Sequence, residues 1–193
     1  MLIWNFPGYG PANLPGQMFV AATGTAVTFS AGLALSYAGL MLINPATVAG
    51  TAPKKLVPLR AIFAPTGTGV APSCPWGMIK AIGTCTAGAA SGFSGIVTTP
   101  GMYGTSTPIA VVAGTASFLN GTTGAVPNGP NWVQYCGVLP VGTATYYAGG
   151  VTTVDLIGEV SVMPGEAMAI APNVAAVGMA SIAWLEIPLN SGA

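Results

Sequence analysis

The sequence is almost free of charged residues, and this restricts the folds open to it. Four Lys or Arg and four Asp or Glu occur in 193 residues, or 4%, whereas soluble domains contain about 25% charged residues. Because Glu, Lys, Gln and Arg usually cover exposed helix faces, amphipathic helices are disfavoured. The 28 glycines and 17 prolines favour short strands joined by turns. The sequence therefore predicts an all-β chain.

The strand pattern is clearest between residues 154 and 188. Residues 154–162 alternate with the period of two expected of a strand with one buried face. Pro164-Gly165 fits the centre of a type II turn, so we expect the chain to reverse there into a second strand at 167–171, forming a hairpin. In a third strand, 179–187, Ile182 and Trp184 share one face, and Pro188 ends the strand because proline has no amide to donate. The other face of the third strand contains Ser181, Ala183 and Leu185.

The remaining sequence predicts further short strands and no repeat of fixed period. We expect them near 18–22, 26–30, 36–44, 56–65, 76–82, 95–98, 109–113 and 133–139. Pro58 lies inside one of them, which argues for an edge strand or a bulge. About eight to ten strands in a chain long enough for one core indicate a single β-sandwich or barrel domain, residues 18–193.

Residues 1–17 are expected to form an extended N-terminal arm. They include three glycines and three prolines together with the aromatic residues Trp4, Phe6 and Tyr9, so they suit neither a helix nor a central strand. Exposing three aromatic side chains to water is unfavourable. The arm is therefore expected either to lie along its own domain or to anchor to a neighbour, and both options stay open.

Three of the four basic residues, Lys54, Lys55 and Arg60, lie within seven positions. The preferred interpretation is that they protect an exposed edge strand from pairing. The alternative is a contact patch for an acidic partner surface.

The sequence offers little catalytic chemistry. It has no histidine, which removes the usual general base and the usual metal ligand. Asp155 and Glu159 would lie roughly 13 Å apart on one strand at ~3.3 Å per residue, farther than glycosidase carboxylates. Cys74, Cys85 and Cys136 lack metal-site spacing and are expected to be free thiols, a Cys74–Cys85 bridge being the alternative. We predict no enzyme, no metal and no cofactor.

Nucleic acid and membrane are not expected as partners either. Four cations cannot neutralise many phosphates. The most apolar run, residues 31–43, is shorter than the ~20 residues of a membrane-spanning helix, and the first residues lack a secretion-signal pattern, so no export is expected. A surface so poor in charge promotes association. We therefore expect partner subunits to cover it.

Several short strings, in their order, resemble the decoration (cement) proteins of tailed-bacteriophage capsids. They are Gly39-Leu40-Met41-Leu42-Ile43-Asn44-Pro45, Lys55-Leu56-Val57-Pro58-Leu59, Asp155-Leu156-Ile157-Gly158, Pro164-Gly165 and Trp184-Leu185-Glu186-Ile187-Pro188. Together they cover about a third of the chain, and residues 83–131 contribute nothing to the resemblance.

The resemblance implies a jelly-roll-like two-sheet sandwich without catalytic residues. It implies a homotrimer on the outer face of an icosahedral phage head, bound to the major capsid protein and stabilising the shell, after assembly in the host cytoplasm. On this hypothesis the candidate partner contacts are Trp4, Phe6, Tyr9, Lys54, Lys55 and Arg60.

Two other functions stay open. One is the major jelly-roll capsid protein of a small virus, although residues 1–53 contain no cation to contact a genome. The other is a receptor- or carbohydrate-binding module of a phage fibre, which would use exposed aromatic residues. Its candidates are Tyr146, Tyr147, Trp76 and Trp132.

Overall fold

The computed structural model describes residues 18–31, 36–45, 52–65, 73–82, 85–87, 96–100, 111–118, 132–140, 151–156 and 160–189. Within these ranges the chain forms strands and no helix. The strands are β1 (Met18–Thr23), β2 (Val27–Phe29), β3 (Ser36–Ile43), β4 (Lys54–Pro65), β5 (Ser73–Ile82), β6 (Cys85–Ala87), β7 (Ile96–Pro100), β8 (Val111–Phe118), β9 (Gln134–Pro140), β10 (Thr152–Asp155), β11 (Glu166–Pro172) and β12 (Ala176–Pro188).

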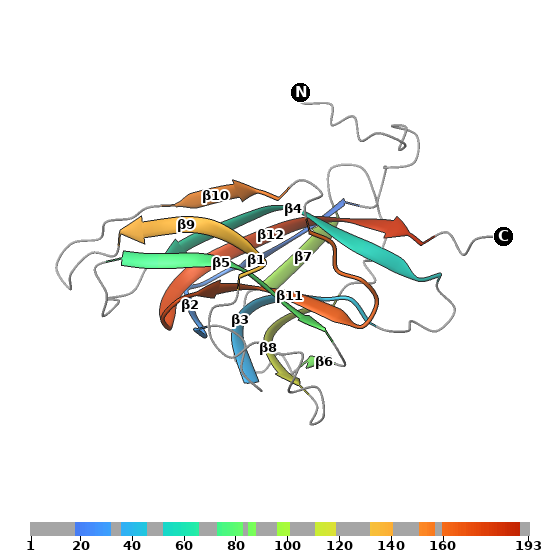
Figure 1. Cartoon of the computed structure of the whole chain (residues 1–193), viewed down its shortest axis with the longest axis horizontal. Coiled ribbons are helices and arrows are strands. Elements are labelled where there is room, and N and C mark those ends of the chain that lie inside the picture. Colours follow the sequence, from blue (N-terminus) through green and yellow to red (C-terminus); the bar gives the residue numbers. More distant parts are fainter. Residues whose placement is uncertain are drawn as a thin grey trace.

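The strands build two antiparallel sheets that form a sandwich (Figure 1). The first, here called sheet A, has the order β10-β4-β12-β1-β7, and β2 also pairs with β12. The second, sheet B, has the order β6-β8-β3-β11-β5-β9. The predicted all-β sandwich is therefore confirmed.

Eight of the strands follow jelly-roll topology. Among these eight strands, the first in the chain pairs with the last, the second with the second last, and likewise for the other two pairs. The pairs are β1 with β12, β3 with β11, β4 with β10, and β5 with β9. These four pairs alternate between the sheets, as they do when one long hairpin is rolled into two layers. Of the four other strands, β2 pairs with β12. The strands β6, β7 and β8 lie between β5 and β9 in the chain and widen the sandwich, because β7 adds to β1 and β8 adds to β3.

The predicted hairpin around Pro164-Gly165 is wrong, although its turn is present. Gly165 has a φ of 86°, and the Glu166 amide donates a 2.9 Å hydrogen bond to the Met163 carbonyl. The strands on either side belong to different sheets, because β10 pairs with β4, whereas β11 pairs with β3 and β5. The turn thus moves the chain from one layer to the other. A turn pattern specifies a reversal, but it does not specify the partner of the next strand.

Pro58 marks a bulge and not an edge. β4 pairs with β12 on one side and β10 on the other, so it lies inside sheet A. Its register with β12 shifts between Arg60, opposite Ala183, and Pro58, opposite Trp184, which leaves Leu59 as the extra residue.

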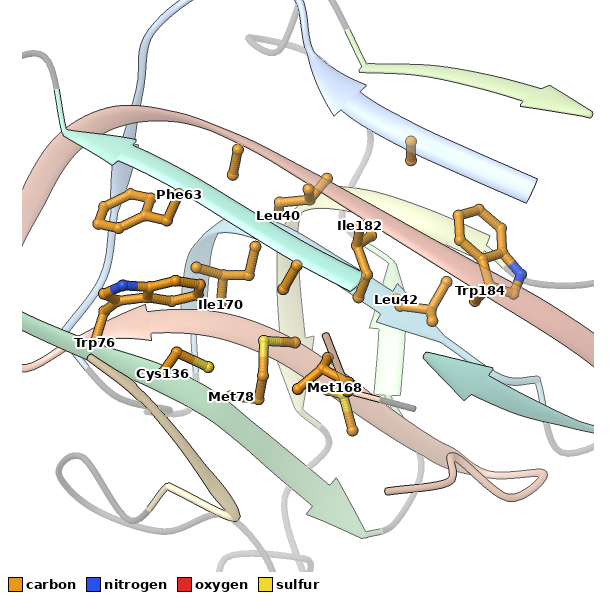
Figure 2. Packing of buried hydrophobic residues seen from close by; sticks show 14 of the residues in the cluster. Leu40, Leu42, Phe63, Trp76, Met78, Cys136, Met168, Ile170, Ile182 and Trp184 are labelled. Atoms are coloured by element: carbon orange, nitrogen blue, oxygen red, sulfur yellow. The ribbon is translucent and has the colours of Figure 1, made fainter. Parts of the chain in front are cut away.

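The hydrophobic core lies between the sheets. Figure 2 shows Phe63, Ile182 and Trp184 from sheet A across from Trp76, Met78 and Met168 from sheet B. The Phe63 and Trp76 rings are 5.5 Å apart, and the Phe19 and Trp184 rings are 5.7 Å apart. As predicted, Ile182 and Trp184 share the buried face of β12.

Two cysteines belong to this core. Cys74 and Cys136 are free and buried, which confirms free thiols at these positions and rules out the Cys74–Cys85 bridge. Burial raises the pKa of both thiols, that of Cys136 to about 12.

Candidate interaction surface

The described residues contain three ion pairs but no metal-site cluster. No group of three or more His, Cys, Asp and Glu side chains gathers within the described ranges. The pairs join Lys54 to Glu186, Arg60 to Asp155 and Lys80 to Glu166. Six of the eight charged side chains in the sequence are thus neutralised by each other.

Lys54 points between the sheets and serves as the counter-ion of a buried carboxylate. Its Nζ lies 3.1 Å from Glu186 Oε2, and the Glu186 side chain is fully buried while that of Lys54 is 20% exposed. Glu186 follows Ile182 and Trp184 on the inner face of β12, so the alternation in the sequence already placed it there. The sequence reasoning did not use this signal. A carboxylate buried at that site requires a cation beside it.

Lys55 and Arg60 lie on the other face of sheet A. Arg60 Nε donates a 2.8 Å hydrogen bond to Asp155 Oδ1, and both side chains are about half exposed, at 50% and 45%. Lys55 pairs in register with Ile187, whose side chain also faces away from the core. The structure therefore divides the three basic residues between two faces, and β4 is no edge strand for them to protect. Trp4, Phe6 and Tyr9 lie outside the described residues.

Sheet A is apolar on both faces at one end. Met18, Leu185 and Val57 are aligned in register across β1, β12 and β4. With Leu59 and Ile187 they form a second cluster, here called the outer cluster, that is separate from the core. Their sequence neighbours Phe19, Trp184 and Leu56 belong to the core on the opposite face. The sequence reasoning separated the two faces of β12 but missed that both are apolar.

Exposure changes along the outer face of β12. Leu185 and Ile187, beside the start of β1, are only 5% and 8% exposed, whereas Met179 and Val177 at the far end are 40% and 41% exposed. The outer face is therefore closed at the end where β1 begins and open at the end where β12 begins.

A second exposed apolar area follows the edge of sheet B. Val133, Tyr135 and Val138, here called the edge strip, are each about half exposed. β9 is the last strand of sheet B, and the sequence from Gln134 to Pro140 has no charge. Natural edge strands usually have charged residues or other features that prevent pairing. Among the strands that the structure describes, only β5 pairs with β9.

Trp132 supports the edge strip. Its ring lies against Gly77 on β5, where an added Cβ would come within 2.5 Å of ring atoms. The indole Nε1 donates a 2.8 Å hydrogen bond to the Ala171 carbonyl, and the ring packs 5.5 Å from that of Tyr135. The platform under Tyr135 is therefore fixed to both β5 and β11.

The aromatic residues proposed for carbohydrate binding are not brought together in the described part. Trp76 is fully buried in the core, so its candidacy is wrong. Trp132 is partly buried under Tyr135, and Tyr146 and Tyr147 lie outside the described residues.

Nothing in the described ranges is a helix long and apolar enough to cross a membrane. Comparison of the chain with protein-family models, with curated proteins and with solved structures found no match in any of the three.

Proposed function

We propose that this chain is a structural virion protein, a capsid decoration protein that assembles as a homotrimer and stabilises the outer face of an icosahedral phage head. The observation that supports this most is the uncharged, apolar edge strip on a jelly roll whose charges are largely paired internally. Such a surface suits another uncharged protein surface better than an ionic ligand. The partners are copies of the same chain and the major capsid protein.

The mode of action follows from binding alone. A subunit cluster that binds the assembled shell and not its dissociated parts stabilises the shell by mass action. No catalytic residue is needed for this role. The edge strip supplies apolar area for contact between subunits, and Arg60 with Lys55 supplies polar contacts on the outer face of sheet A.

The test combines native mass measurement with electron microscopy of heads that lack this chain. We expect the purified chain to have three times the mass of one subunit and to add density to the outer face of the heads. Tyr135→Lys with Val138→Lys should give monomers, because burying two unpaired cations at a subunit contact is costly. Ala52→Lys, at an exposed position before β4, is the matched control and should leave the trimer intact. A wild-type monomer that leaves the heads bare would refute the proposal.

The jelly-roll order itself favours one further candidate, because viral capsid domains use the same topology. A major capsid protein of a small virus should form closed shells from the chain alone. Electron microscopy of the purified chain therefore distinguishes the two functions: isolated trimers support decoration, and empty shells support the major capsid protein.

A further inference from the structure

A second largely buried ion pair, between Lys80 and Glu166, lies on the inner face of sheet B. Each residue is two positions from a core methionine, Met78 on β5 or Met168 on β11, so the two-residue period of a strand places both on that face. Lys80 Nζ is 2.6 Å from Glu166 Oε2, and the two side chains are only 21% and 14% exposed. The pair therefore lies at the end of the core where β11 begins.

Glu166 also fixes the turn that moves the chain from one sheet to the other. Its Oε2 accepts a 2.7 Å hydrogen bond from the Met163 amide, and its own amide donates to the Met163 carbonyl. The Gly165 amide donates to the Asn44 carbonyl, and the Asn44 amide donates to the Glu166 carbonyl. One carboxylate oxygen thus holds both Lys80 and the first part of the turn.

The other end of the turn is bonded to sheet A. Val162 and Leu56 exchange two backbone hydrogen bonds, of 2.8 and 2.9 Å, and both residues are fully buried in the core. The Asn44 side chain donates to the carbonyls of Val162 and Lys54. A continuous series of polar contacts therefore runs from Lys80 in sheet B to Leu56 in sheet A.

Residues 162–166, here called the latch, depend on the contacts at their two ends. Among the described residues, the latch is paired with sheet A only through the isolated bridge between Val162 and Leu56. Because Val162 is only four residues from Glu166, movement of the Glu166 end displaces the bridge as well. Contiguous contacts of this kind open as cooperative units while the rest of a protein stays folded.

We propose that the latch is a single opening unit that joins the ends of the two sheets, and that Lys80 keeps it closed from sheet B. Its opening separates Val162 from Leu56 and exposes the core beside them, while the pairing of β12 with β1 is kept. This device does not depend on the capsid function.

Amide hydrogen exchange of the full chain, followed by nuclear magnetic resonance, tests the proposal. Lys80→Met removes the cation and keeps a long side chain. In this variant the amides of Asn44, Leu56, Val162 and Gly165 should exchange severalfold faster, all by the same factor, because one opening exposes them all. Protected amides in the part of β12 that pairs with β1 should keep their wild-type rates.

Two control variants separate the latch from a general effect of charge. Lys80→Arg keeps a cation and should keep the wild-type rates. Arg60→Met removes a cation from β4 itself, but the ion pair of Arg60 with Asp155 lies outside the latch, so the rates at Leu56 and Val162 should not change.

Two results for Lys80→Met would overturn the proposal. Faster exchange at Gly165 with unchanged rates at Leu56 and Val162 would show that the two ends of the latch open independently. An equal increase throughout β12 would show that this end opens only when the whole domain unfolds. Exchange is measured on the chain without capsids, so neither result bears on the capsid function.

Discussion

The ammonium group of Lys54 lies 3.1 Å from the carboxylate of Glu186, and this pair joins the first residue of β4 to the inner face of β12. The two residues are 132 positions apart in the sequence. Glu186 has no exposed surface while Lys54 retains some, so the two partners should respond differently to substitution.

Lys54→Met should be the more damaging change, because it leaves a buried anion without its cation. We expect a loss of about 3–5 kcal/mol in the free energy of unfolding. Glu186→Gln should cost only about 1 kcal/mol, since the partly exposed ammonium can turn to water and the amide keeps a hydrogen bond. Urea denaturation measures both. Equal losses would contradict the asymmetry, and the double variant should recover much of the loss of Lys54→Met.

Arg60 and Asp155 should contribute little to stability. Both side chains are about half exposed, and ion pairs of this kind are worth at most about 1 kcal/mol. Arg60→Ala should therefore shift the urea midpoint only slightly, and the shift should shrink in high salt. If Arg60 is a partner contact as proposed, the same variant should bind capsids more weakly while staying folded. Asp155→Ala is the matched control for loss of the ion pair alone.

The stability of the fold should depend on the side-chain amide NH2 group of Asn44. Its Nδ2 donates 2.8 Å hydrogen bonds to the carbonyls of Lys54 and Val162, and its backbone bonds both Gly165 and Glu166. This residue thus ties the end of β3 to β4 and to the turn between the sheets. Asn44→Asp keeps the shape but places acceptors against two carbonyl oxygens.

We expect Asn44→Asp to lose about 2 kcal/mol or more in unfolding free energy near neutral pH, because the buried carbonyls lose their donor. Part of this loss should be regained in acid, where the new carboxyl group becomes protonated and can donate. A pH series of denaturation curves checks this. An Asn44→Asp protein as stable as the wild type would show that the two hydrogen bonds are dispensable.

The buried thiol of Cys136 should make stability depend on alkaline pH. Burial raises its pKa from 9.0 to about 12, so between these values the unfolded state loses a proton that the folded state keeps. Rising pH therefore favours unfolding, with a contribution of about 1 kcal/mol near pH 10 that is absent below about pH 8. Cys136→Ala should show a smaller fall in unfolding free energy between pH 7 and pH 10 than the wild type. If the unfolding free energy fell equally with pH in the wild type and in Cys136→Ala, the raised pKa of Cys136 would be contradicted.

The sequence predicted the strands and their faces because alternation is a local property. Ile182 and Trp184 face the core as expected, and Pro58 coincides with a bulge. The strand expected at 154–162 is shorter, because β10 ends at Asp155 and Val162 forms only an isolated bridge with Leu56. Strand boundaries were less accurate in the middle of the chain, where β8 spans Val111–Phe118 and the prediction ended at residue 113.

Pairing between distant strands could not be predicted in the same way. The Pro164-Gly165 turn has the expected local geometry, yet the strands beside it belong to different sheets, because their partners were selected by packing of two layers. Lys54, Lys55 and Arg60 are close in sequence, but the pleat and the bulge place Lys54 beside Glu186 and Arg60 beside Asp155.

The sequence by itself determined that the protein is all-β, that β12 has an inner and an outer face, and that its surface is poor in charge. These are consequences of composition and of the two-residue period of a strand. Only the tertiary structure decided the jelly-roll pairing, the contact between Lys54 and Glu186 and the apolar outer cluster around Leu185. Each of these depends on residues far apart in the chain that come together when the two sheets pack.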